Sequence, residues 1–150
     1  MKKQTKIFLG IIAVLVGIQL IPIDRTHAPV EATKNFVTIE NTPREIQTLI
    51  KNACYDCHSN EVKYPWYAYI APISWSVKNH INEGQEHLNF SEWGTYNKEL
   101  KKRMMQKSVE EIENRKMPLS GYLPLHPEAR LTAEQRQMMI QYFQQIEQRN

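Results

Sequence analysis

Glycine is scarce in this chain of 150 residues, and no stretch alternates polar and apolar residues as a strand would. There are five glycines and eight prolines. A sandwich or barrel of short strands needs frequent glycine-rich turns, so that class is excluded. The composition instead predicts one all-α domain whose helices are separated by proline-containing breaks. Hydrophobic residues make up 41% of the chain, which is enough for a folded core.

Charge of one sign is also lacking outside the amino terminus. The formal net charge is +3, but Lys2, Lys3 and Lys6 precede the first apolar run and no acidic residue does. The rest of the chain has 16 basic and 16 acidic side chains. A nucleic-acid-binding protein needs a basic surface, so we expect no nucleic-acid partner.

One long hydrophobic run is present, IFLGIIAVLVGIQLIPI at residues 7–23, and its 17 residues carry no charge. This length is short for a spanning helix and long for a signal-peptide core. Bulky residues follow where signal peptidase needs small ones, which favours an uncleaved membrane anchor. Secretion to the periplasm after cleavage is the alternative. The preceding lysines predict a single pass through the cytoplasmic membrane, with the carboxy-terminal domain on the outer side.

The predicted organisation has three parts. Residues 1–23 form the anchor or signal segment, residues 24–41 form a polar tether, and residues 42–150 form the folded domain. Within that domain, three capping boxes predict helices that begin at Thr42, Ser108 and Thr132. Two further helices are expected, one from Pro72 to a terminating Gly84 and one over residues 97–106, with a loop at 85–94.

Only two cysteines are present, and both lie in Cys54-Tyr55-Asp56-Cys57-His58. This C-x-x-C-H pattern is the attachment motif of c-type haem. Two intervening residues allow both sulfurs to reach the two vinyl groups on one edge of the porphyrin from a single helical turn. His58 then lies under the ring as the proximal iron ligand. The motif predicts one covalent haem c, inserted by the cytochrome c maturation machinery outside the cytoplasmic membrane.

Other uses of the cysteines fit less well. A thioredoxin-like redox pair would follow a strand in a βαβ unit, and no such pattern is found. A zinc site would need two more ligands such as His80 and His87, whose spacing across Gly84 is not compact. A disulfide between Cys54 and Cys57 would close a very small loop and stabilise little.

Met117 is our first candidate for the sixth iron ligand. It precedes Pro118 in a loop between predicted helices, and its soft thioether favours ferrous iron. The rivals are His80, on a predicted helix, His87, and His126, in a loop that we expect to be exposed. An open sixth position is the other alternative.

Tyr64 and Trp66 belong to the aromatic sequence Tyr64-Pro65-Trp66-Tyr67, just past the proximal histidine. They are candidates to cover the haem edge or to hydrogen-bond a propionate. The alternative is that they are ordinary core residues at a turn. The carboxy-terminal helix carries a stripe that we assign to the core: Met138, Met139, Tyr142, Phe143 and Ile146.

The order of these motifs resembles a small monohaem cytochrome c. More closely, it resembles the bacterial haem-binding domain family of short membrane-anchored proteins. The resemblance covers roughly residues 40–147 and rests on CYDCHSN at 54–60, YPWY at 64–67, LNFSEW at 88–93 and KMP at 116–118. It implies that Cys54 and Cys57 hold the haem and that His58 and Met117 are its axial ligands. Residues 43–53 contain no glycine, so the close helix crossing of cytochromes c is not expected.

These features predict a single-electron carrier with membrane or periplasmic redox proteins as partners. The alternative is a haem-based sensor or ligand-binding module whose sixth position is open or displaceable. No acid–base pair or nucleophile adjoins the motif, so we do not expect an enzyme.

Overall fold

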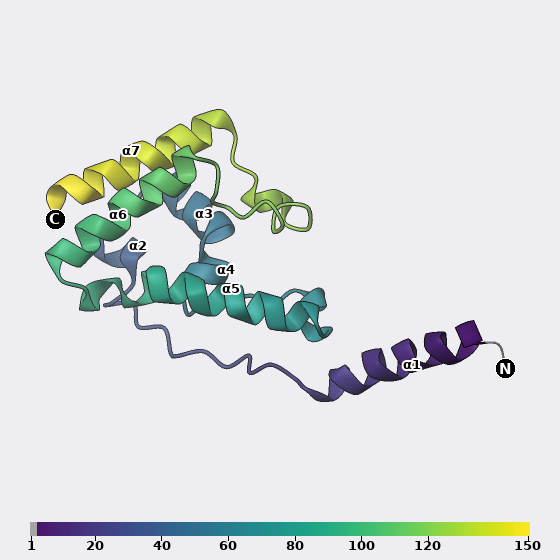
Figure 1. The fold of residues 1–150 in the computed structure, drawn as a ribbon. Coiled ribbons are helices and arrows are strands. Elements are labelled where there is room, and N and C mark those ends of the chain that lie inside the picture. Colours follow the sequence, from purple (N-terminus) through teal and green to yellow (C-terminus); the bar gives the residue numbers. More distant parts are fainter. Residues whose placement is uncertain (1–2) are drawn as a thin grey trace.

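The computed structural model describes residues 3–150, and all of its regular elements are helices (Figure 1). The all-α fold is therefore confirmed. The α-helices are α1 Lys3–Gly17, α2 Phe36–Ile39, α3 Arg44–Ala53, α4 Tyr55–His58, α5 Ile73–His87, α6 Lys98–Glu113 and α7 Ala133–Arg149. Short 3₁₀ turns are η1 Ile18–Leu20, η2 Trp66–Tyr69, η3 Phe90–Thr95 and η4 Pro127–Ala129. Met1 and Lys2, which open the expected 1–23 segment, lie outside the described residues.

The domain is built from two helical layers with the C-x-x-C-H motif between them. Helices α6 and α7 run antiparallel at the top of Figure 1, and α5 runs below them. Helix α3 packs on α7, and α4 packs on α5 (Figure 1). The motif, which ends in α4, therefore lies where the two layers meet.

An aromatic cluster forms the centre of the core. Phe36 is fully buried and meets Phe90 and Trp93 edge-on, each at a centroid distance of 5.0 Å. Phe143 of α7 packs against the same ring at 6.1 Å. Asn35 caps α2 by accepting a hydrogen bond from the Val37 N–H, and this turn directs Phe36 inward. The packed domain thus includes residues that were expected in the polar tether over 24–41.

Two of the three expected helix starts are wrong. The α3 helix begins at Arg44 with Pro43 before it, and the Thr42 hydroxyl instead accepts a hydrogen bond from Tyr142. Ser108 lies inside α6 and donates to the Met104 carbonyl one turn earlier. The apolar positions of α6 continue across Ser108, so packing on α7 keeps the helix intact. The capping box of Thr132 and Gln135 is confirmed at the start of α7.

The expected end of α5 at Gly84 is also wrong, because the helix continues to His87. Most of the expected loop at 85–94 is therefore helical, since η3 begins at Phe90.

At the other end of the chain, Lys3–Leu20 forms an exposed helical segment of 18 residues with mean hydropathy 1.5. By length and composition it is suited to be a membrane span or a signal sequence.

Candidate functional site

The helical backbone breaks at Cys54 and restarts as the single turn α4. Cys54 has a φ of −127°, outside the helical region, and it separates α3 from α4. Tyr55 then points into the core, where its ring stacks on Phe90 at 5.4 Å. Residues on one helical turn point in different directions, so burial of Tyr55 leaves Cys54 and Cys57 facing a cavity.

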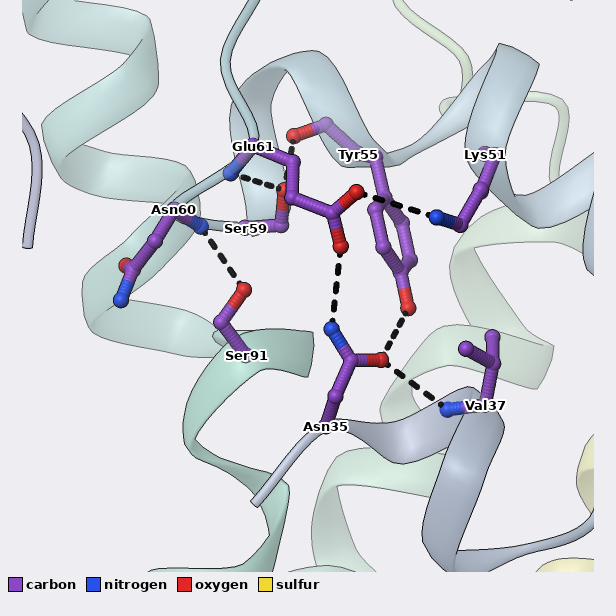
Figure 2. A network of polar contacts seen from close by, with 8 residues as sticks. All are labelled: Asn35, Val37, Lys51, Tyr55, Ser59, Asn60, Glu61 and Ser91. Atoms are coloured by element: carbon purple, nitrogen blue, oxygen red, sulfur yellow. Dashed lines mark hydrogen bonds and ion pairs between the residues drawn. The ribbon is translucent and has the colours of Figure 1, made fainter. Parts of the chain in front are cut away.

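A polar network fixes the outer side of this turn (Figure 2). The Tyr55 hydroxyl donates to Asn35 Oδ1 over 2.9 Å, and Asn35 Nδ2 donates to Glu61 over 3.0 Å. Lys51 of α3 forms an ion pair with the other oxygen of Glu61 at 3.0 Å. The turn is therefore held to α2, to α3 and to the segment that follows it.

Serine side chains secure the chain just after the motif (Figure 2). Ser59 Oγ donates to the Tyr55 carbonyl over 2.8 Å and accepts from the Glu61 N–H over 2.9 Å. Ser91 Oγ accepts from the Asn60 N–H over 3.0 Å. Buried polar groups that are all paired favour one rigid arrangement, so these contacts fix the direction in which His58 leaves the turn.

Gly84 allows α5 to approach the motif closely. A Cβ atom at this position would lie 2.5 Å from the carbonyl oxygen of Cys57. Gly84 thus allows the backbones of α5 and α4 to come into close contact. It does not end the helix, although the sequence suggested that it would. Nearby, Gln85 donates to the Ser59 carbonyl over 2.6 Å.

The carboxyl end of α5 also orients the histidine. His58 Nδ1 lies 3.0 Å from the carbonyl oxygen of Leu88. A carbonyl can only accept, so Nδ1 carries the proton and Nε2 is left with its lone pair. Burial lowers the pKa of His58 below its ordinary value, despite the hydrogen bond to Leu88. The imidazole is therefore neutral at neutral pH, as iron ligation requires.

The His58 ring borders a cavity of about 380 Å³, within the size range of cofactor pockets. One wall is α5, with His80, Glu83, Gly84 and His87. The opposite side is formed by α6 and the loop that follows it, and the apolar lining includes Leu88, Phe90, Met104, Ile112, Pro118, Leu119 and Phe143. The cavity thus combines a hydrophobic lining with a few polar groups.

Most of the residues expected at the site line this one cavity. They are Cys54, Cys57, His58, His80, His87 and Met117. Both His80 and His87 are exposed on α5, the helix that also holds His58 through Leu88. Met117 comes from the separate loop after α6, so it approaches the cavity from another element.

Tyr64, Trp66 and His126 do not line the cavity. Trp66 is 70% exposed, and Tyr64 stacks on His27 at 6.3 Å. His126, expected in an exposed loop, is 8% exposed because its ring stacks on Tyr122 at 3.8 Å. Its Nε2 also lies 2.8 Å from the Tyr67 hydroxyl.

Tyr122 is a cavity residue that the sequence analysis missed. It lines the cavity, and its hydroxyl donates to Asp56 Oδ2 over 2.7 Å. Burial, followed by the hydrogen bond to Asp56, raises the pKa of Tyr122, so the hydroxyl remains a donor at neutral pH. No local pattern marks this tyrosine, because its partner lies 66 residues away in the sequence.

The protonation of the thiols separates this site from a redox-active pair. Both cysteines are free. Burial raises the pKa of Cys54 to about 12 and that of Cys57 to about 11. Thioredoxin-like cysteines depend on a lowered thiol pKa, so neither thiol fits that role. Among residues 3–150, no three His, Cys, Asp or Glu side chains are grouped in a way that could hold a metal ion.

Comparison with known families is decisive for the cofactor class. The family model described as "Haem-binding domain" matches residues 13–145. The chain belongs to the haem-binding domain family. In this haem-binding domain, the match spans the motif, both cavity walls and most of α7. No curated protein and no solved structure matches the chain.

The cavity residues fit a haem group. Two free thiols and an imidazole with a fixed tautomer come from one turn, and a thioether comes from the loop after α6. The hydrophobic lining suits a porphyrin ring, which binds through apolar contact. The exposed side of the cavity carries polar side chains, which include His80, His87 and Lys107.

Proposed function

We propose that this haem-binding domain carries one haem, covalently attached through Cys54 and Cys57, and acts as a single-electron carrier outside the cytoplasmic membrane. One observation carries the proposal: both thiols and the His58 ring border the same cavity, and the Leu88 carbonyl leaves Nε2 available for iron. In this proposal His58 is the proximal ligand and Met117 is the sixth ligand.

Attachment needs no oxidant. Each thiol adds its sulfur to the inner carbon of a vinyl group, while the thiol hydrogen goes to the outer carbon. The reaction therefore requires reduced cysteines, and Cys54 and Cys57 are both free. Burial keeps these thiols protonated, so we assign their activation to the maturation machinery that presents the haem.

When bound, haem supplies an iron atom that cycles between its ferrous and ferric states. The residues of this chain bind and orient the group and keep water from the iron. Leu88 holds the imidazole, and the apolar lining lowers the local polarity, which is one determinant of the reduction potential. None of these roles supplies a proton or a nucleophile to a substrate, so we propose a carrier and not an enzyme.

The location in this proposal follows from α1. The apolar segment Lys3–Leu20 would anchor the protein, and the lysines before the run would keep its start in the cytoplasm. The haem-binding domain then faces the periplasm, and its partners are membrane or periplasmic redox proteins.

A pyridine haemochrome spectrum tests cofactor and covalency together. The protein is matured in a host that makes c-type cytochromes and is then extracted with acidified acetone. We expect the spectrum of a thioether-linked haem, with the pigment retained in the protein fraction. The variant Cys54→Ala/Cys57→Ala should lose its pigment to the solvent. A colourless mature protein, or wild-type pigment that is extracted, would overturn the proposal.

A displaceable sixth ligand is the second candidate, and it would make the domain a haem-based sensor. The position of Met117 favours this option, because a half-buried residue on a loop can move away more readily than one on a helix. Carbon monoxide distinguishes the two functions. Immediate binding to the ferrous protein supports a sensor, whereas resistance supports the electron carrier.

A further inference from the structure

The end of the apolar amino-terminal segment is fixed to the segment that precedes α5. The Gln19 side chain donates to the Ala71 carbonyl and accepts from the Ala71 N–H, both over 3.0 Å. The Trp75 indole N–H donates to the Ile21 carbonyl over 3.1 Å. In Figure 1, the carboxyl end of α1 accordingly lies beside the start of α5. The candidate span therefore joins the domain at a defined place.

This junction is surrounded by exposed apolar side chains, which we call the 66–75 surface: Trp66, Tyr69, Ile70, Ile73 and Trp75. Trp66 is 70% exposed and Ile73 is 49% exposed. Leu20 and Ile21, at the end of the span, are exposed as well. Elsewhere in the domain, the large hydrophobic residues are mostly buried in the core. A concentrated exposed patch of this kind marks an interaction surface.

We propose that the 66–75 surface lies in the headgroup region of the bilayer that α1 enters, as a second membrane contact. The proposal rests on the membrane anchor of the proposed function. Three features favour lipid as the occupant. The surface is continuous with the apolar span, its tryptophan and tyrosine side chains are typical of membrane interfaces, and the Arg25 guanidinium lies over the Tyr69 ring at 4.1 Å.

The length of the span points in the same direction. Its 18 helical residues reach about 27 Å, slightly less than the hydrocarbon thickness of a bilayer. A short span draws the residues at its end toward the bilayer. Gln19 is part of that end, and its contacts with Ala71 would hold the start of α5 close to the bilayer as well. The family match also begins at residue 13, inside α1, so it covers the end of the span together with the domain.

Such a contact would set the position of the haem cavity. Ile73 begins α5, and Gly84 on the cavity wall follows 11 residues later, about 16 Å along the helix. Gly84 in the cavity wall would therefore lie about 16 Å from the membrane-contacting residue of the same helix. A redox partner embedded in that membrane would then find the haem at a fixed distance from the membrane surface.

The three tryptophans make the proposal testable in the intact, mature protein. Trp66 and Trp75 lie in the 66–75 surface, whereas Trp93 is fully buried in the core. The full chain is placed in lipid nanodiscs, and its indole N–H signals are recorded by NMR in the ferrous state. Lipids with a nitroxide near the headgroup are then added. We expect the Trp66 and Trp75 signals to broaden several-fold more than the Trp93 signal.

A charge placed in the surface gives the second measurement. Ile73→Glu adds a carboxylate at the exposed start of α5, where a helix tolerates it, and Ile73→Leu is the matched control. The Glu variant should lose most of the broadening at Trp66 and Trp75, and the Leu variant should keep it.

Co-sedimentation with vesicles separates the two proposals. If the chain stays with the vesicles but Trp66 and Trp75 are broadened no more than Trp93, the second contact is wrong and the anchor stands. This is also the result expected if the surface binds a protein instead of lipid. If the mature chain does not sediment with vesicles, the anchor fails and the second contact fails with it.

Discussion

Tyr122 and Asp56 are joined by a hydrogen bond of 2.7 Å that ties the loop carrying Met117 to α4, the turn that holds Cys57 and His58. Asp56 lies between the two cysteines, and Tyr122 follows Met117 by five residues. Stacking of Tyr122 on His126 at 3.8 Å extends the contact within the same loop. One hydrogen bond to the motif therefore restrains the loop that carries the sixth-ligand candidate.

Replacing Tyr122 with phenylalanine should loosen this loop. The variant keeps the ring and its stacking but leaves Asp56 Oδ2 without its donor. Loss of a hydrogen bond to a charged acceptor costs about 1.5–3 kcal/mol, so the ferrous protein should bind carbon monoxide about ten times faster or more. Stopped-flow spectroscopy measures the rate, and Tyr64→Phe, outside the cavity, is the control. Equal rates in Tyr122→Phe and wild type would show that the bond does not position the loop.

Met117→Leu tests the sixth ligand directly, because leucine fills a similar volume without a sulfur atom. We expect loss of the sulfur-to-iron charge-transfer band of the ferric protein, a lower reduction potential and rapid binding of carbon monoxide. Met138→Leu is the matched control, since Met138 is half-buried on α7 and does not line the cavity. An unchanged spectrum in Met117→Leu would exclude Met117 and direct attention to His80 and His87.

Gly84→Ala should be destabilising, although alanine is the better helix former by about 1 kcal/mol. The added Cβ would lie 2.5 Å from the Cys57 carbonyl oxygen, so α5 must move away from α4. We expect the free energy of unfolding to fall by about 2 kcal/mol, with less haem per protein. Chemical denaturation and pyridine haemochrome measure these effects. A Cβ at Gly121 meets no atom within 4 Å, so Gly121→Ala should behave as wild type.

Tyr55→Phe should change stability in a pH-dependent way. Burial raises the pKa of Tyr55 in the folded protein, so the unfolded chain loses this proton first as the pH rises. Wild type therefore loses stability above pH 10, by up to about 1.4 kcal/mol per pH unit from this group. Below pH 10 the variant should be about 1 kcal/mol less stable, because it lacks the hydrogen bond to Asn35.

Denaturation at pH 8 and at pH 11 measures this difference for Tyr55→Phe. We expect the gap between wild type and variant to shrink, and to change sign, at the higher pH. Tyr69→Phe provides the control for loss of an exposed tyrosine hydroxyl. A gap that does not depend on pH would show that Tyr55 titrates equally in the folded and unfolded chains.

The sequence was most informative where an interaction is local. The spacing of Cys54, Cys57 and His58 is set within one helical turn, so these residues could be recognised without knowledge of the fold. The same holds for the capping box of Thr132 and Gln135, whose partners are three residues apart. Predictions from local patterns were wrong where a tertiary contact uses the same side chain. Thr42, for example, accepts a hydrogen bond from Tyr142 and does not cap α3.

By itself, then, the sequence determined the helical class, the apolar amino-terminal segment and the candidate groups for binding haem. Only the tertiary structure showed that Gly84 serves close packing, that Tyr122 reaches Asp56, and that Trp66 is exposed beside the end of α1 instead of at the cavity. The reason is physical. Periodicity and motif spacing report neighbours along the chain, whereas cavity walls and exposed surfaces are made by residues that packing brings together from distant segments.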